Sequence, residues 1–213
     1  RRLFWLKIPA RFIIIALCHT RPTCTLHHDP QEGCPLMNPA VPLPLEPLPY
    51  HVEMVRHLQD READLWRWFS SASIQAQQND AVRLDLLRST YRLERDAAPA
   101  LYAAADQVAA LFHLAAPMTF YQSQGAAGLN ASLAYMPGEV HVVRTGPLAS
   151  TLTPAELRCV IGHELLHFAL LDQWPDYLIA AQMLSAMSND SAAELSHLAS
   201  DRLFHLYAEV YCD

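Results

Sequence analysis

The stretch Gly162-His163-Glu164-Leu165-Leu166-His167 decides the fold and most of the chemistry of this chain. Residues four apart in an α-helix lie one turn apart on one face, so the side chains of His163 and His167 can reach a single metal ion. Glu164 then lies beside that ion, where its carboxylate can act on a water molecule. The spacing therefore predicts a zinc site of the kind that catalyses hydrolysis.

The residues before this motif predict that it lies inside a helix. Thr153, Pro154 and Glu156 form the pattern of an N-cap, a first-turn proline and a capping-box glutamate. Glu164 falls within the apolar stripe of that helix, so we expect it to be buried. A buried carboxylate needs a cation or a hydrogen-bond partner, and a zinc ion with its water would serve. The alternative is a chance match, in which Glu164 pairs with a core arginine and the histidines only pack.

A catalytic zinc site uses three protein ligands and leaves the fourth position to water. The metzincin pattern would require glycine and histidine where this chain has Leu170 and Gln173. A glutamate further along remains, and Glu194 and Glu209 both lie in a stretch with helical spacing. We favour Glu209 because Asp213 follows one turn later, where its carboxylate can accept a hydrogen bond from the ring of a zinc-bound histidine.

Several segments, in this order, carry a resemblance to a known family: Asn130-Ala131-Ser132, Thr145-Gly146-Pro147-Leu148, Leu152-Thr153-Pro154-Ala155-Glu156-Leu157, the motif itself, and Glu209 with Asp213. Over about residues 95–213 the chain resembles the HtpX and CAAX-prenyl-protease type of zinc metallopeptidase. One departure is the arginine that often precedes the family's third ligand by a few residues. The nearest here is Arg202, seven positions before Glu209.

The resemblance implies a gluzincin-like endopeptidase domain that acts on proteins or peptides. In it His163, His167 and Glu209 would bind one zinc ion (Zn2+) per chain, and Glu164 would be the general base. Asp213 would support a histidine from behind. In the resembling family a substrate peptide adds to the edge of the sheet along the cleft, so we expect Asn130 at that edge, although asparagine also forms turns.

The secondary structure expected from residue patterns is mostly helical. Helical spacing covers residues 51–69, 80–95 and 97–114, and three short strands are expected at 118–122, 129–135 and 139–143. We therefore predict an α+β, zincin-like metallopeptidase domain with a small three-stranded antiparallel sheet before the metal-binding helix.

The chain divides into a proline-rich segment and a folded domain. Residues 1–49 are predicted to be disordered, and residues 50–213 to form the catalytic domain. The spacing of Cys18, Cys24 and Cys34, with His27 and His28 between them, does not match the usual zinc ribbon. Because Glu209 lies only four residues before the last residue of this sequence, where relatives continue, we expect a C-terminally truncated fragment.

Composition excludes several classes of function. A formal net charge of −7 without a basic cluster argues against nucleic-acid binding. No apolar run is long enough to predict a membrane span. The five cysteines do not suggest a disulfide framework, Cys159 and Cys212 are expected to be reduced packing residues, and we expect a cytoplasmic protein.

The function predicted from the sequence is therefore that of a zinc-dependent metalloendopeptidase. One alternative is a catalytically impaired zinc-binding or regulatory module on the same fold. Another is a structural helical domain that carries the motif by coincidence.

Overall fold

The computed structural model describes residues 46–124 and 128–213. Most of the segment predicted to be disordered, and the cysteines and histidines within it, lie outside this part. The helices of the described part are α2 (Pro49–Arg61), α3 (Ala63–Phe69), α4 (Ala72–Ser89), α5 (Pro99–Leu111), α6 (Leu148–Thr151), α7 (Pro154–Gln173), α8 (Pro175–Ser188) and α9 (Leu195–Cys212), with one 3-10 turn at Arg95–Ala97.

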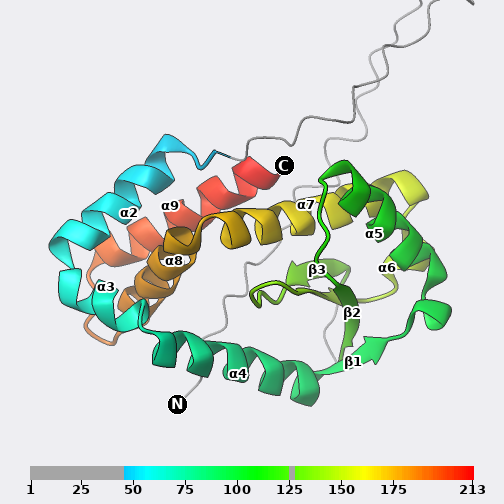
Figure 1. Ribbon diagram of the computed structural model, residues 1–213, viewed down its shortest axis with the longest axis horizontal. Coiled ribbons are helices and arrows are strands. Elements are labelled where there is room, and N and C mark those ends of the chain that lie inside the picture. The colour runs from blue at the N-terminus through cyan, green and yellow to red at the C-terminus, as the bar shows by residue number, and fades with distance from the viewer. Residues whose placement is uncertain (1–45, 125–127) are drawn as a thin grey trace, which may run out of the picture.

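Helix α7 runs through the middle of the molecule and joins its two halves (Figure 1). On one side α2, α3, α8 and α9 pack together as a group of helices. On the other side lie α5, α6 and the sheet. Helix α4 connects the two halves, running from α3 to the first strand. The His-Glu-His motif on α7 therefore lies where the two halves meet.

The sheet has four strands in the order β1-β2-β4-β3. They are β1 (Thr90–Leu93), β2 (Met118–Ser123), β3 (Asn130–Leu133) and β4 (Val140–Thr145). Strands β1 and β2 are antiparallel, β2 and β4 are parallel, and β3 and β4 are antiparallel. The prediction of three antiparallel strands was therefore wrong: the sheet is mixed and has a fourth strand.

Two physical causes explain the difference. The predicted helix over residues 80–95 ends at Ser89, because the next four residues become extended and pair with β2. Strand β4 carries Val140 and Val142, which are almost fully buried, so it occupies the centre of the sheet next to β2. Strand β3, with the polar residues Asn130 and Ser132, is left at the edge.

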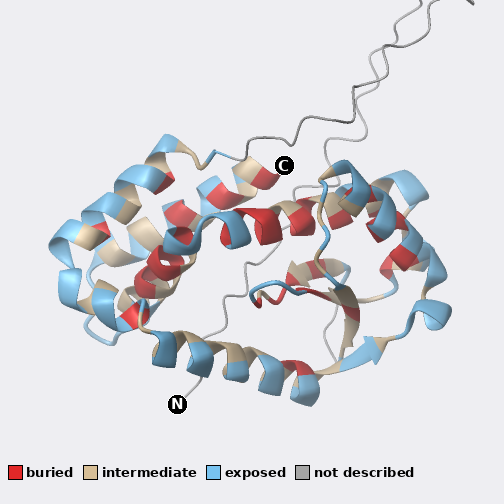
Figure 2. Ribbon diagram, in the orientation of Figure 1, coloured by how far each residue is buried: buried red, intermediate tan, exposed pale blue. Residues whose placement is uncertain are grey.

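One hydrophobic core holds the strands and helices together. Phe120 of β2 and Val142 of β4 pack in the same cluster as Leu165 of α7 and Phe204 of α9. Buried residues follow α7 and the parts of α8 and α9 that face it (Figure 2). Burial of apolar area contributes about 25 cal/mol per Å² to folding, so this core fixes where α7 lies against α9.

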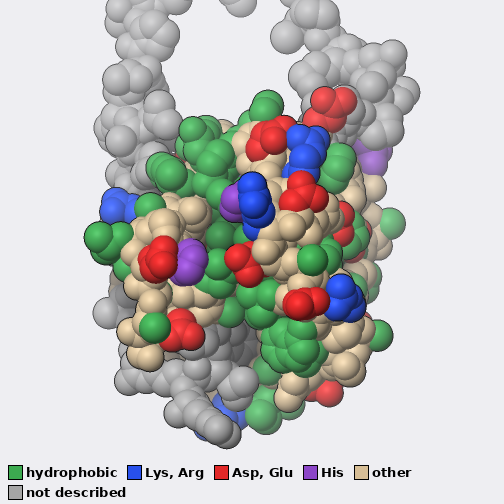
Figure 3. All heavy atoms as spheres, turned by 90° about the vertical axis from the view of Figure 1, so that its left-hand side faces the viewer, with side chains coloured by type: hydrophobic (Ala, Val, Ile, Leu, Met, Phe, Trp, Pro, Cys, Tyr) green, Lys and Arg blue, Asp and Glu red, His purple; other side chains and the backbone are tan. Residues whose placement is uncertain are grey.

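Of the two remaining helix predictions, one differs in its division and the other in its ends. The helix expected over residues 51–69 is two helices, which meet at Glu62, and the one expected over 97–114 is α5. Within the part of the chain that the structure describes, no helix is long and apolar enough to cross a membrane. On the face seen in Figure 3, acidic and basic side chains are interspersed with hydrophobic ones.

Candidate metal centre

Helix α7 begins and ends as its sequence requires. The side chain of Thr153 accepts a hydrogen bond from the backbone N–H of Glu156, and the Glu156 carboxylate accepts one from the backbone N–H of Thr153 at 2.8 Å. This capping box confirms the predicted helix start. The helix ends at Gln173, before Pro175 starts the next one. His163 and His167 therefore lie well inside a regular helix, one turn apart.

The three polar residues of the motif are buried. His163, Glu164 and His167 are 5%, 3% and 2% exposed. They lie on the side of α7 that contacts β3 and α9. The expectation that Glu164 points inward is confirmed, whereas no arginine ion pair to it is found in the described part of the chain. Each of these buried polar side chains needs a hydrogen-bond partner or a compensating charge.

Helix α9 brings a carboxylate to the two histidines. The Nε2 atoms of His163 and His167 lie 3.1 Å apart. Glu209 Oε2 lies 3.2 Å from His163 Nε2, and Glu209 Oε1 lies 3.5 Å from His167 Nε2. The three residues form a group whose ligand atoms could hold one ion.

The far nitrogen of each ring has its own neighbour. His163 Nδ1 lies 3.0 Å from Asp213 Oδ1, close enough for an ion pair, although the two are not aligned for a hydrogen bond. His167 Nδ1 lies 3.3 Å from the sulfur of Cys212. An acceptor next to each Nδ1 favours the proton on that nitrogen and leaves the lone pair on Nε2.

The donor set fits a zinc ion. Ligands held about 2.0–2.1 Å from a tetrahedral zinc ion lie about 3.4 Å from one another, close to the separations of 3.1–3.5 Å found here. With both ring protons on Nδ1, two nitrogen lone pairs and a carboxylate converge without a proton between them. Oε1 of Glu209 is also buried and has no hydrogen-bond partner in the described part. Such a convergence of acceptors calls for a cation.

The pKa shifts of the cluster show that it favours positive charge. Burial by itself would raise the pKa of Glu209, but the adjacent rings of His163 and His167 outweigh it and lower the pKa to about 2. Burial would lower the pKa of His163, yet the hydrogen bond to Glu209 and the charges of the nearby carboxylates raise it. The cluster therefore keeps Glu209 ionised, as a metal ligand must be.

Glu164 faces the edge of the sheet. Burial raises the pKa of its carboxyl, while the nearby histidines and a hydrogen bond from the backbone of Leu133 act in the opposite direction. Leu133 is the last residue of the edge strand β3. The carboxyl group with the raised pKa therefore lies between the cluster of His163, His167 and Glu209 and a strand edge.

The other residues singled out from the sequence lie outside the cluster. Asn130 is half-buried at the start of β3, about 10 Å along the strand from Leu133. Glu194 is exposed at the N-cap of α9, roughly 22 Å along the helix from Glu209, so it cannot bind the same ion. Arg202 is exposed on α9. Cys159 is exposed as well, so the prediction that it packs in the interior was wrong.

Two contacts were missed in the sequence. Cys212 was expected only to pack, yet it lies three residues after Glu209, and residues three apart share a helix face. That spacing could have revealed its contact with His167. His51 gave no such signal, because its partners come from helices more than a hundred residues away.

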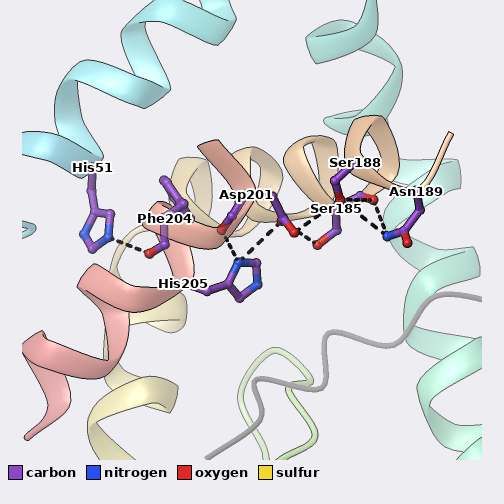
Figure 4. A network of polar contacts seen from close by, with 7 residues as sticks. All are labelled: His51, Ser185, Ser188, Asn189, Asp201, Phe204 and His205. Carbon is purple, nitrogen blue, oxygen red and sulfur yellow. Dashed lines mark hydrogen bonds and ion pairs between the residues drawn. The ribbon is translucent and has the colours of Figure 1, made fainter. Parts of the chain in front are cut away.

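Helix α9 is itself held by polar contacts far from the cluster (Figure 4). His51 Nε2 of α2 hydrogen-bonds to the carbonyl oxygen of Phe204 at 3.2 Å. The carboxylate of Asp201 accepts hydrogen bonds from Ser185 and Ser188 at the end of α8, at 3.1 and 3.2 Å. These contacts tie α9 to α2 and α8, so they help to fix where Glu209 lies.

Comparison with known proteins identifies the family. The family model of peptidase family M48 matches residues 97–203, a segment that contains the histidine motif and stops before Glu209. No curated protein and no solved structure gave a match. The matched segment is half of the chain and includes strands β2, β3 and β4 and helices α7 and α8. With a mostly helical zincin-like fold and a buried His-Glu-His motif, this chain belongs to peptidase family M48, a family of metallopeptidases.

Proposed function

We propose that this protein is a zinc-dependent metalloendopeptidase in which His163, His167 and Glu209 hold one zinc ion. The observation that carries the proposal is the convergence of two Nε2 atoms and one carboxylate within 3.1–3.5 Å of one another, with ring neighbours that keep the inward lone pairs free. A zinc ion bound there would supply a Lewis acid and lower the pKa of a water molecule.

The protein's own groups would then carry the proton. Glu164 is the general base that takes a proton from the attacking water and delivers it to the leaving amine. Its burial supports this role, because burial raises the pKa of the carboxyl group and makes it a stronger base. Asp213 would orient the ring of His163 from behind.

The edge of β3 is our proposed binding site for the substrate main chain. In an antiparallel pair alternate residues bond to the neighbouring strand, and the backbone N–H of Ala134 bonds to His141 on that side. Leu133 is one residue earlier, so its N–H points to the free edge, toward Glu164. A peptide added as an extra strand would pass beside Glu164 and run toward Asn130.

The test combines metal content with hydrolysis. We would measure zinc per chain by elemental mass spectrometry and the cleavage of fluorescently labelled casein, for the wild type and Glu164→Gln. We expect about one zinc ion in both proteins and a loss of about 10²–10⁴-fold in the cleavage rate of the variant. Asp172→Asn, which changes an exposed carboxylate on the same helix, is the matched control and should leave both values unchanged.

Each outcome distinguishes the proposal from its alternatives. Zinc without cleavage in the wild type would favour a catalytically impaired zinc-binding module on the same fold. Equal cleavage by Glu164→Gln and the wild type would mean that another group is the base. Absence of zinc from the wild type would contradict the metal site itself.

A further inference from the structure

We propose that Cys212 positions His167 by accepting a hydrogen bond from its Nδ1–H when zinc is bound. This inference rests on the proposed function, since it concerns how one proposed zinc ligand is held. In this proposal the sulfur of Cys212 orients the ring of His167, as the carboxylate of Asp213 would orient the ring of His163.

The geometry is specific. Cys212 Sγ lies 3.3 Å from His167 Nδ1, and the two residues are 4% and 2% exposed. Cys212 lies in the last turn of α9, three residues after Glu209. Residues at this spacing share a helix face, so one turn of α9 supplies both a ligand and the neighbour of another ligand.

The chemistry of the two atoms determines which one donates. A zinc ligand must offer a lone pair, so His167 bound through Nε2 carries its proton on Nδ1. That proton points to Cys212 Sγ. The sulfur can accept this hydrogen bond, although sulfur is a weak acceptor. A neutral sulfur is a weaker acceptor than a carboxylate, so the support for His167 is weaker than that for His163.

A purely structural role for Cys212 would predict a different pattern of variants. Cys212→Val keeps an apolar side chain of similar size but removes the acceptor. Cys212→Ser keeps an acceptor but is smaller and more polar. If the sulfur only packs, valine should be the better replacement; if it holds His167, serine should be.

The experiment measures zinc affinity of the full chain by competition with a chromophoric chelator. We expect Cys212→Val to bind zinc about tenfold more weakly than the wild type, at the lower end of the 10- to 100-fold effects of such partners. Cys212→Ser should stay within about threefold of the wild type, by the same reasoning. Cys159→Val, which replaces the exposed cysteine of α7, is the control and should not change the affinity.

Imidazole 15N NMR reports which ring nitrogen of His167 carries the proton, a property that packing alone would not change. In the zinc-loaded wild type, His167 should carry its proton on Nδ1, and the signal of that proton should shift in both variants. A valine variant with wild-type affinity and an unchanged His167 signal would overturn the proposal. If the valine variant does not fold, a His167 without a proton on Nδ1, or a tenfold loss in the serine variant, would overturn it.

Failure of the proposed function is recognised separately. Zinc stoichiometry of the wild type is measured first, and a chain that binds no zinc would reject the metal site and this inference together. A wild type that binds one zinc ion without cleaving casein would leave the role of Cys212 open to the same affinity and NMR tests.

Discussion

His51 of α2 and the two buried histidines of α7 contact helix α9 at different places, and their surroundings differ. His51 is 1% exposed, as deeply buried as His167. Its neighbours are the rings of Tyr177 and Phe204, with centroids 4.9 and 4.8 Å away, and its Nδ1 has no hydrogen-bond partner in the described part. The histidines of α7 instead face carboxylates.

The difference shows in the direction of the pKa shifts. Burial lowers the pKa of His51, and the hydrogen bond to the Phe204 carbonyl only partly opposes it. Burial acts in the same direction on His163, but the hydrogen bond and charge of Glu209 reverse it. Burial of a histidine therefore does not by itself indicate a metal site. The indication comes from the carboxylate of Glu209, which converges on the ring nitrogens of both histidines.

Removing that carboxylate should have the largest effect. We expect Glu209→Ala to weaken zinc binding about a thousandfold or more, because even loss of an outer partner costs about 10- to 100-fold. Chelator competition measures the affinity. Glu194→Ala, which removes an exposed glutamate at the start of the same helix, is the control. A variant that keeps wild-type affinity would show that Glu209 is not a ligand.

Removing an aromatic neighbour of His51 should lower the free energy of unfolding. Phe204 is fully buried and stacks on Tyr177, so Phe204→Ala should lower the free energy of unfolding by about 3–5 kcal/mol. Urea denaturation measures the change. Leu195→Ala, at an 84% exposed position of α9, should change it by no more than about 0.5 kcal/mol. Equal midpoints for the two variants would contradict the importance of this packing.

A smaller effect is expected from removal of Asp213, the carboxylate next to the ring of His163. Asp213→Ala removes the neighbour of Nδ1, 3.0 Å away, without removing a ligand. We expect a loss of zinc affinity of about 10- to 100-fold. Asp172→Ala, an exposed position on α7, serves as the reference in the same titration. An unchanged affinity would mean that the ring of His163 is held by packing alone.

The smallest effect is a pH dependence that comes from His51. Because its pKa is lower in the folded than in the unfolded protein, the unfolded state binds more protons at acidic pH. Its contribution to stability is therefore constant above about pH 6.5 and decreases as the pH falls below that value, by at most about 1.4 kcal/mol per pH unit.

Urea denaturation at pH 7.5 and pH 5, with a chelator to remove zinc effects, measures this slope. His51→Gln keeps a donor near the Phe204 carbonyl but does not titrate. As the pH is lowered, the free energy of unfolding of the wild type should decrease relative to that of His51→Gln. A difference that is the same at both pH values would contradict the prediction.

Short-range patterns explain what was predictable. The capping box and the spacing of His163 and His167 involve residues within one or two helical turns, so helix geometry alone predicts them. The burial of Glu164 follows from helical phase in the same way. Strands β2, β3 and β4 were also recognised, because each is a local run of residues.

Pairing between distant segments explains what was not predictable. The β1 strand is made by its pairing with β2 rather than by its own residues, and the parallel β2–β4 contact depends on which strand fills the centre. The environment of His51 combines α2, α8 and α9. No local pattern carries this information, since the free energy comes from contacts between elements.

The sequence by itself determined the helix that carries the His-Glu-His motif, its capped start, the buried glutamate and the preference for Glu209 over Glu194, because all rest on the periodicity of helices or on residue spacing. Only the tertiary structure decided that Glu209, 46 residues after His163, converges with both histidines, and that Asp213 and Cys212 lie behind their rings. Packing of the core between α7 and α9 fixes those distances, and such packing depends on the whole chain.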